Sequence, residues 1–273
     1  NHIMTPEEKF SFDLEGYLVL KGVLTKTEID ELNILADSVW PGKYDESGIR
    51  RVNKISQWGM ATQALIDHAG ILAYLVELIG PKVRIDHDYS MFMRKGGRAG
   101  YLHGGPTPQI EIGDHWYRHH DGIIRNGLTV VSYLLTDARP EDGGFCCIPG
   151  SHKSNFVTSL PDVVRKYERI PHYVYQPPAK AGDVIIFTEA LMHGTLPWAA
   201  NHERRVLLYK YCPGHSAFSP QGYYDPADYP SATEQQLRLL SPPSILAGYD
   251  HQLRNGKNTI RPDVIADTES AKP

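Results

Sequence analysis

Two histidines and an aspartate are side chains whose types and spacing could bind one metal ion. His119 and Asp121 are separated by one residue, and His193 follows much later in the chain. Two neutral imidazoles and one carboxylate form a facial triad, which binds Fe(II) on one face and leaves the other positions open. In a strand, residues i and i+2 point to the same side, so His119 and Asp121 can share a metal while His120 faces away. We therefore expect a fold that brings distant strands together at these residues.

Two polar side chains after His193 could bind a cosubstrate. A guanidinium at Arg204 could bind the far carboxylate of a dicarboxylic acid through two parallel hydrogen bonds. Its neighbour Arg205 would face the other side of a strand, and the hydrophobic pattern does not decide which of the two points inward. The hydroxyl of Thr195, two residues after His193, could bind the same carboxylate.

The composition is that of an ordinary globular protein. The chain has 273 residues, of which 41% are hydrophobic and 22% charged, and its formal net charge is −4. The lack of a basic block argues against nucleic acid or an anionic membrane as a partner. No apolar run approaches the ~20 residues of a membrane span, and three cysteines suit a reduced protein better than a disulfide framework. We expect a cytoplasmic protein with a small-molecule substrate, and the sequence leaves its oligomeric state open.

The pattern of apolar residues predicts a mainly β fold with flanking helices. Thr25 and Glu28 match a capping box ahead of an amphipathic helix at 26–39, and a second helix is expected at 62–79. The glycine-rich stretch 96–105 is expected to form an irregular active-site loop. Short extended runs between turn signals favour a sandwich or closed double sheet. The expected strands cover 16–24, 83–93, 128–135, 145–148, 172–176, 183–187 and 206–211, and a last helix is expected at 233–240.

No repeat, low-complexity segment or linker divides the chain. We therefore expect one domain over residues 5–273, with residues 1–4 interpreted as vector-derived residues and a start methionine. Its barrel core is expected at about 83–213, after a helical flank, and an extension over 214–273 is expected to pack on the outside.

Several motifs, taken in order, resemble the phytanoyl-CoA dioxygenase family. They are the start at 12–20, His119-His120-Asp121, the run 141–152 with its Asp142-Gly143-Gly144-Phe145 turn, the run 182–187, His193-Gly194-Thr195 and Arg204-Arg205. The resemblance spans roughly residues 10–213. It implies a jelly-roll core of the double-stranded β-helix type, and a dioxygenase that uses Fe(II), 2-oxoglutarate and O2.

The resemblance also implies roles for individual residues. His119, Asp121 and His193 match the iron ligands, Arg204 matches the residue that anchors 2-oxoglutarate, and Thr195 falls near the cosubstrate. The implied reaction couples decarboxylation of 2-oxoglutarate to succinate and CO2 with oxidation of a substrate C–H bond. Hydroxylation is the simplest outcome, and desaturation and epoxidation stay open. The carboxylate of Asp121 argues against a halogenase, in which a small residue would replace it.

The region 96–117 has no counterpart in the better-known members of the family, so the substrate in the family's name is not carried over. The mixture of aromatic and cationic side chains there suits a polar or carboxylated small molecule. A coenzyme A thioester would need a clearer basic cluster for its phosphates. The candidate substrate contacts are Arg98, Tyr101, His103 and Trp116.

Two other kinds of protein would use the same ligands. Zinc accepts two histidines and a carboxylate with an open position for water, so a metal hydrolase or a cupin-type isomerase is one alternative. A hydrolase would have no need of Arg204. A jelly roll that binds a metal or ligand without turnover is the other alternative. Succinate formation that requires both iron and 2-oxoglutarate would separate an oxygenase from both.

Overall fold

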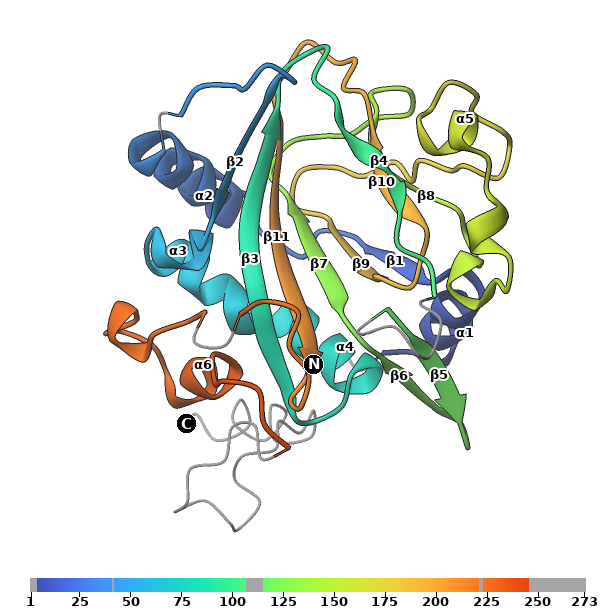
Figure 1. Ribbon diagram of the computed structural model, residues 1–273. Coiled ribbons are helices and arrows are strands. Elements are labelled where there is room, and N and C mark those ends of the chain that lie inside the picture. The colour runs from blue at the N-terminus through green and yellow to red at the C-terminus, as the bar shows by residue number, and fades with distance from the viewer. Residues whose placement is uncertain (1–3, 41, 107–114, 221–222, 246–273) are drawn as a thin grey trace.

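Two β-sheets enclose the interior of the molecule, and most of the helices cover the larger one (Figure 1). The computed structural model describes residues 4–40, 42–106, 115–220 and 223–245. The larger sheet has six strands in the order β1-β9-β7-β11-β3-β2, and the smaller sheet has three in the order β4-β10-β8. The strand pairs are antiparallel. This architecture confirms the expected jelly-roll core.

The bounds of the elements are as follows. The larger sheet comprises β1 (Tyr17–Leu20), β2 (Ile49–Asn53), β3 (Val83–Met93), β7 (Thr129–Leu134), β9 (Val184–Thr188) and β11 (Arg204–Pro213). The smaller sheet comprises β4 (Ala99–His103), β8 (Gly144–Cys147) and β10 (His193–Leu196), and a separate ribbon comprises β5 (Tyr117–His120) and β6 (Ile123–Asn126). The α-helices are α1 (Pro6–Glu15), α2 (Lys26–Val39), α3 (Met60–Gln63), α4 (Ala69–Leu78), α5 (Asp162–Arg165) and α6 (Glu234–Leu239).

Local signals set the helix boundaries. Helix α2 has the predicted bounds, and the Thr25 side chain accepts a hydrogen bond from the backbone N–H of Glu28 as a capping box requires. The single helix expected at 62–79 is instead broken into α3, a 3-10 turn (Ala64–Asp67) and α4. The break lies at His68, whose extended backbone caps α4 and whose ring accepts a hydrogen bond from the Gly70 N–H.

Two other expectations about the strands were wrong. The stretch 96–105 is not an irregular loop throughout, because β4 within it pairs with β10. Residues 172–176 form no strand and contribute only one bridge, between Tyr175 and Cys147. Helix α6 packs against β3 and the 3-10 turn, and residues 246–273 of the expected extension lie outside the described residues.

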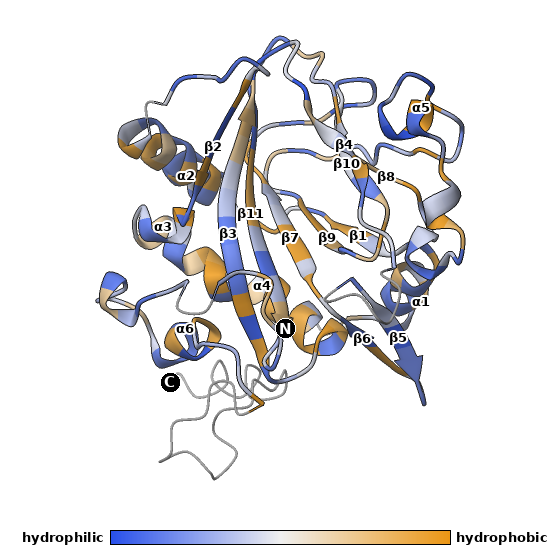
Figure 2. Cartoon of the chain, viewed as in Figure 1, coloured by the Kyte–Doolittle hydropathy of each residue, from blue (hydrophilic) through white to orange (hydrophobic). Residues whose placement is uncertain are grey.

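The larger sheet separates two apolar clusters. Its outer face packs against the helices through residues such as Tyr209 and Ile186, and its inner face carries Val130, Phe187 and Leu208. Strands β7 and β9 are accordingly hydrophobic over most of their length, whereas β5 is hydrophilic (Figure 2). Among the described residues, no helix is both long enough and apolar enough to cross a membrane.

Candidate metal centre

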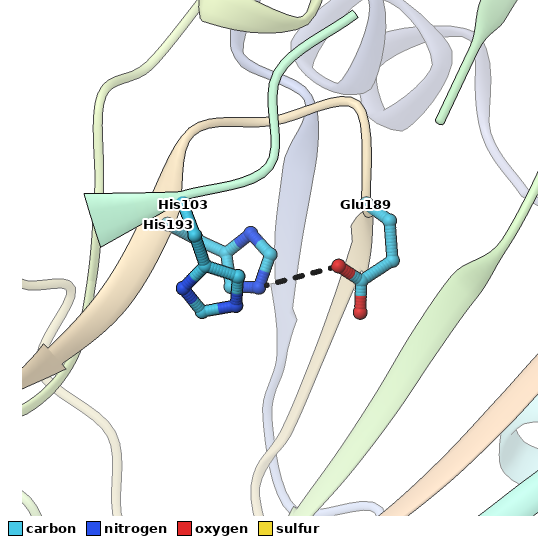
Figure 3. Close-up of side chains that lie close together, drawn as sticks. All are labelled: His103, Glu189 and His193. Carbon is cyan, nitrogen blue, oxygen red and sulfur yellow. Dashed lines mark ion pairs between the residues drawn. The ribbon is translucent and has the colours of Figure 1, made fainter. Parts of the chain in front are cut away.

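Three side chains at the junction of the two sheets can bind one metal ion. His103 ends β4, His193 begins β10, and Glu189 follows β9, so that each offers a ligand atom within 4.8 Å of the others (Figure 3). The two imidazole centroids are 4.3 Å apart, because His103 and His193 are direct partners in the β4–β10 pairing. His193 Nε2 lies 3.5 Å from Glu189 Oε2.

Both imidazoles are oriented in the same way. The Nδ1 of His103 lies 2.7 Å from the carbonyl oxygen of Tyr101, and the Nδ1 of His193 lies 2.7 Å from that of Leu191. A carbonyl can only accept, so Nδ1 carries the proton and Nε2 keeps a lone pair for a metal. Burial lowers the pKa of His193 to about 4, although Glu189 opposes the shift. The ring is therefore neutral at pH 7, as a metal ligand must be.

Lys210 fixes the carboxylate of Glu189. Burial alone would raise the pKa of Glu189, but the Lys210 ammonium holds it well below the usual range. The Lys210 Nζ donates a 2.5 Å hydrogen bond to Glu189 Oε1. The carboxylate is therefore ionised, and its second oxygen stays directed toward His193.

Glycine at position 104 allows the two sheets to meet here. A Cβ on Gly104 would lie 2.6 Å from the Leu191 carbonyl oxygen and 2.7 Å from that of Glu189. The backbone at Gly104 also has a φ of +82°, which favours glycine. The glycine-rich sequence after His103 therefore serves close backbone approach.

The predicted ligands His119 and Asp121 are not brought to His193. Both are exposed, His119 on β5 and Asp121 in the turn that leads to β6. The Asp121 carboxylate lies 3.0 Å from the Nδ1 of its neighbour His120, and both side chains are more than 80% exposed. Of the three predicted ligands, the structure places only His193 in the cluster, where Glu189 and His103 take the other two positions.

The structure distinguishes Arg204 from Arg205. Arg204 is buried, lies against Gly144 of the smaller sheet and contacts the Met93 sulfur at 3.5 Å. Burial lowers its pKa to about 10, and no ion pair links it to a carboxylate of the described residues. Arg205 points outward and pairs with Asp37 and Glu203. The guanidinium that faces the interior is therefore that of Arg204. The sequence alone did not decide between Arg204 and Arg205.

Of the predicted cosubstrate and substrate contacts, only His103 belongs to the candidate cluster. Thr195 is half-buried on β10, two residues after His193. Arg98 and Tyr101 are exposed, and Trp116 is half-buried beneath the Arg118 guanidinium. His103, predicted as a substrate contact, instead lies among the metal-binding side chains. Residues 107–114 of the region 96–117 lie outside the described residues.

Two residues of the candidate cluster were not predicted as metal ligands, although the sequence carried a signal for each. Glu189 precedes His193 by four residues, directly after a strand of buried residues. His103 stands before Gly104-Gly105, so the position of the carboxylate in a His-x-Asp motif is taken by a glycine. In the candidate cluster the carboxylate is that of Glu189.

Comparison with known proteins agrees with the architecture. Residues 107–206 match the phytanoyl-CoA dioxygenase (PhyH) family. An ectoine dioxygenase from Sphingopyxis alaskensis is 28% identical over 221 residues, which cover 68% of each chain. The chain is therefore similar to the phytanoyl-CoA dioxygenase family over residues 107–206. The expected enzyme class, an Fe(II)- and 2-oxoglutarate-dependent oxygenase, is thereby confirmed.

Two solved structures are similar to this chain over most of its length. HygX from Streptomyces hygroscopicus, with nickel and 2-oxoglutarate bound, is 25% identical and covers 84% of this chain and 94% of its own, with a TM-score of 0.69. EctD from S. alaskensis with bound Fe is 25% identical, covers 77% of each chain and has a TM-score of 0.59. The family match begins at residue 107, so it includes His119 and Asp121 but not His103.

Proposed function

We propose that this enzyme oxidises a C–H bond of a small molecule, most simply by hydroxylation, at an Fe(II) ion held by His103, Glu189 and His193. The proposal is supported by the cluster itself, in which two imidazoles and one carboxylate from different strands converge. Its relatives include an ectoine dioxygenase and a HygX structure with nickel and 2-oxoglutarate bound. Fe(II), 2-oxoglutarate and O2 would together supply the oxidant at this site.

The residues present fit an iron ion. The donor set is that of the facial triad, with a glutamate in the carboxylate position. The imidazoles offer lone pairs at Nε2, and Lys210 keeps the Glu189 carboxylate charged without occupying its second oxygen. The remaining coordination positions would open toward the interior, where a cosubstrate can bind.

Arg204 is proposed to bind the far carboxylate of 2-oxoglutarate. A guanidinium buried without a carboxylate partner is costly, and a dicarboxylic cosubstrate would provide the missing negative charge. The methionine sulfur at 3.5 Å is only a weak acceptor and does not compensate the charge. Thr195, on the same face of β10 as His193, could donate its hydroxyl to the same carboxylate.

Apolar side chains between Arg204 and the cluster would exclude water. Val206 and Leu208 alternate with Arg204 along β11, and both are buried. Phe187 packs its ring 4.7 Å from that of His193. The protein would thus hold the cosubstrate and the substrate carbon in a dry interior, which favours oxidation of the substrate over side reactions.

The test is succinate formation by the purified protein. With iron, 2-oxoglutarate and O2, the protein should release succinate, and omission of either iron or 2-oxoglutarate should abolish it. Mass-spectrometric screening of metabolites should then find one with a gain of 16 or a loss of 2 mass units. Turnover with zinc alone, and no succinate, would favour the hydrolase or isomerase. Binding of 2-oxoglutarate without any decarboxylation would favour the non-catalytic jelly roll.

We also propose a cytoplasmic location, which the three free cysteines support.

A further inference from the structure

A row of aromatic rings lies beside the candidate metal centre along β3. The rings of Tyr89 and His87 are nearly parallel, with an angle of 12° and centroids 6.0 Å apart. Phe218 follows His87 at 5.7 Å, and His115 follows Phe218 at 6.4 Å. The row reaches the metal centre, because His115 Nε2 lies 4.0 Å from Glu189 Oε2.

A buried ionic anchor keeps the ring of Phe218 in this row. The Phe218 side chain is 62% exposed, so packing does not hold it. The Asp86 carboxylate accepts hydrogen bonds from the backbone N–H groups of Phe218 at 2.9 Å and Ser219 at 3.0 Å. Arg84 pairs with Asp86 and donates to the Ser216 carbonyl oxygen. A large apolar ring fixed in an exposed position beside a reaction centre suits ligand binding.

An arginine lies beside Tyr89 at one end of the row. The Arg51 guanidinium carbon lies 3.8 Å from the centroid of the Tyr89 ring. Arg51 is exposed, and it lies on the same face of β2 as Ile49, which packs against the inner core. Its neighbour Arg50 faces the other side and pairs with Glu203. A guanidinium stacked on a ring is held in place while its N–H donors remain available at its edge.

The positive charge at this end has no counterpart among the described residues. Arg51 forms no ion pair with a described carboxylate, and neither does Lys54, whose ammonium lies 5.0 Å over the Tyr223 ring. The carboxylates near these rings are already engaged, since Asp86 binds the backbone described above and Asp88 accepts from Ser56 and Tyr224. Arg51 and Lys54 therefore place two cations beside an aromatic surface, where they are available to an anion from outside the chain.

We propose that the substrate is an aromatic carboxylate, whose ring lies along the aromatic row and whose carboxylate binds the Arg51 guanidinium. This inference rests on the proposed function, and it adds the chemical class of the substrate. A carboxylate matches the fork of a guanidinium, and Lys54 adds to the attraction.

The experiment measures binding of matched probes to the protein loaded with nickel and 2-oxoglutarate. Nickel replaces iron so that the protein does not oxidise the probes. The probes are 3-phenylpropanoate, its neutral amide and hexanoate. The binding of each probe is measured by ligand-observed NMR titration. Wild-type protein should bind 3-phenylpropanoate at least tenfold more tightly than the amide. Arg51→Gln should remove this preference, and Phe218→Ala should weaken both aromatic probes but not hexanoate. Arg139→Gln, at an exposed arginine on the Asp137–Asp142 turn, should bind all probes as the wild type does.

Equal binding of the acid and the amide, equal losses for both probes in Arg51→Gln, or no binding of either aromatic probe would overturn the inference. Failure of the proposed function is recognised separately, by the absence of succinate from the iron-loaded wild type. Nickel and 2-oxoglutarate binding should be the same in Arg51→Gln and in the wild type. A raised 2-oxoglutarate requirement in Arg51→Gln would instead assign this arginine to the cosubstrate and overturn the inference.

Discussion

The Lys210 ammonium donates a 2.5 Å hydrogen bond to Glu189 Oε1, and the other oxygen of the same carboxylate lies 3.5 Å from His193 Nε2. Both partners of this ion pair are almost completely buried. One oxygen of Glu189 is thus held by the protein, and the other remains for a metal.

Replacement of Lys210 by methionine should make the protein depend on its metal. The buried Glu189 carboxylate would lose its compensating charge, and removal of one partner of a buried pair costs roughly 3–5 kcal/mol. A bound divalent ion would restore that charge, so nickel should raise the melting temperature of Lys210→Met more than that of the wild type. Thermal unfolding with and without nickel measures both effects. Lys26→Met, which breaks an exposed pair with Asp30, should leave both values near those of the wild type. Equal nickel shifts in Lys210→Met and wild type would argue against a metal at Glu189.

Substitution of Gly104 by alanine should reduce metal affinity by about 10- to 100-fold, the range typical of disturbed ligand orientation. The new Cβ would clash with the carbonyl oxygens of Leu191 and Glu189 and so separate β4 from the turn that carries the ligands. Gly100→Ala is a matched control, since Gly100 lies on the same strand, also has a positive φ and has nothing within 4 Å of the Cβ position. Metal titration of both variants should show the loss only at position 104. The same loss at both positions would indicate backbone strain alone.

Exchange of Arg204 for lysine should raise the KM for 2-oxoglutarate roughly tenfold, because one charge-assisted hydrogen bond is lost when a point charge replaces a fork. Arg205→Lys should leave this KM unchanged and lower the stability instead, since Arg205 binds Asp37 and Glu203 on the outer side. The KM of each variant is measured from succinate formation as a function of 2-oxoglutarate concentration. A larger effect on KM at Arg205 would place the cosubstrate anchor on the other face of β11.

A pH-dependent contribution to stability is expected from His152, away from the metal centre. Burial lowers its pKa in the folded protein to about 4, and Lys153 adds to the shift. Between pH 6.5 and 4 the unfolded chain therefore binds a proton that the folded chain does not. Stability should fall as the pH falls through this window, and His152 contributes nothing to this slope above pH 6.5.

His152→Asn should reduce the loss of unfolding free energy between pH 7 and 4.5 by roughly 2–3 kcal/mol. Denaturant unfolding at a series of pH values measures the free energy of unfolding. His172 is exposed, so His172→Asn is the control substitution. A slope in His152→Asn identical to that of the wild type would contradict the assignment.

The elements with strong local signals could be predicted from the sequence. Helix α2 has its capping box, and β3, β7 and β9 are runs of apolar or alternating residues that the structure reproduces within one or two residues. His193 is also predicted from the sequence, whereas strand periodicity alone does not decide which of Arg204 and Arg205 points inward.

The rest of the metal centre depends on contacts that no local pattern reveals. Glu189 becomes a ligand candidate only because the chain turns from β9 to β10 and crosses between the sheets. His103 lies in a glycine-rich stretch that suggests flexibility, whereas Gly104 is required by the carbonyl groups against it. His119 and Asp121 match a familiar motif and alternate correctly, but their ribbon pairs only with itself.

The most direct test compares metal binding by two sets of variants. Nickel affinity, measured by calorimetric titration in the presence of 2-oxoglutarate, should be lost in His103→Ala, Glu189→Ala and His193→Ala. The double variant His119→Ala with Asp121→Ala should bind nickel as the wild type does. Loss of binding in the double variant, with normal affinity in Glu189→Ala, would contradict the ligand set proposed here and restore the one expected from the sequence.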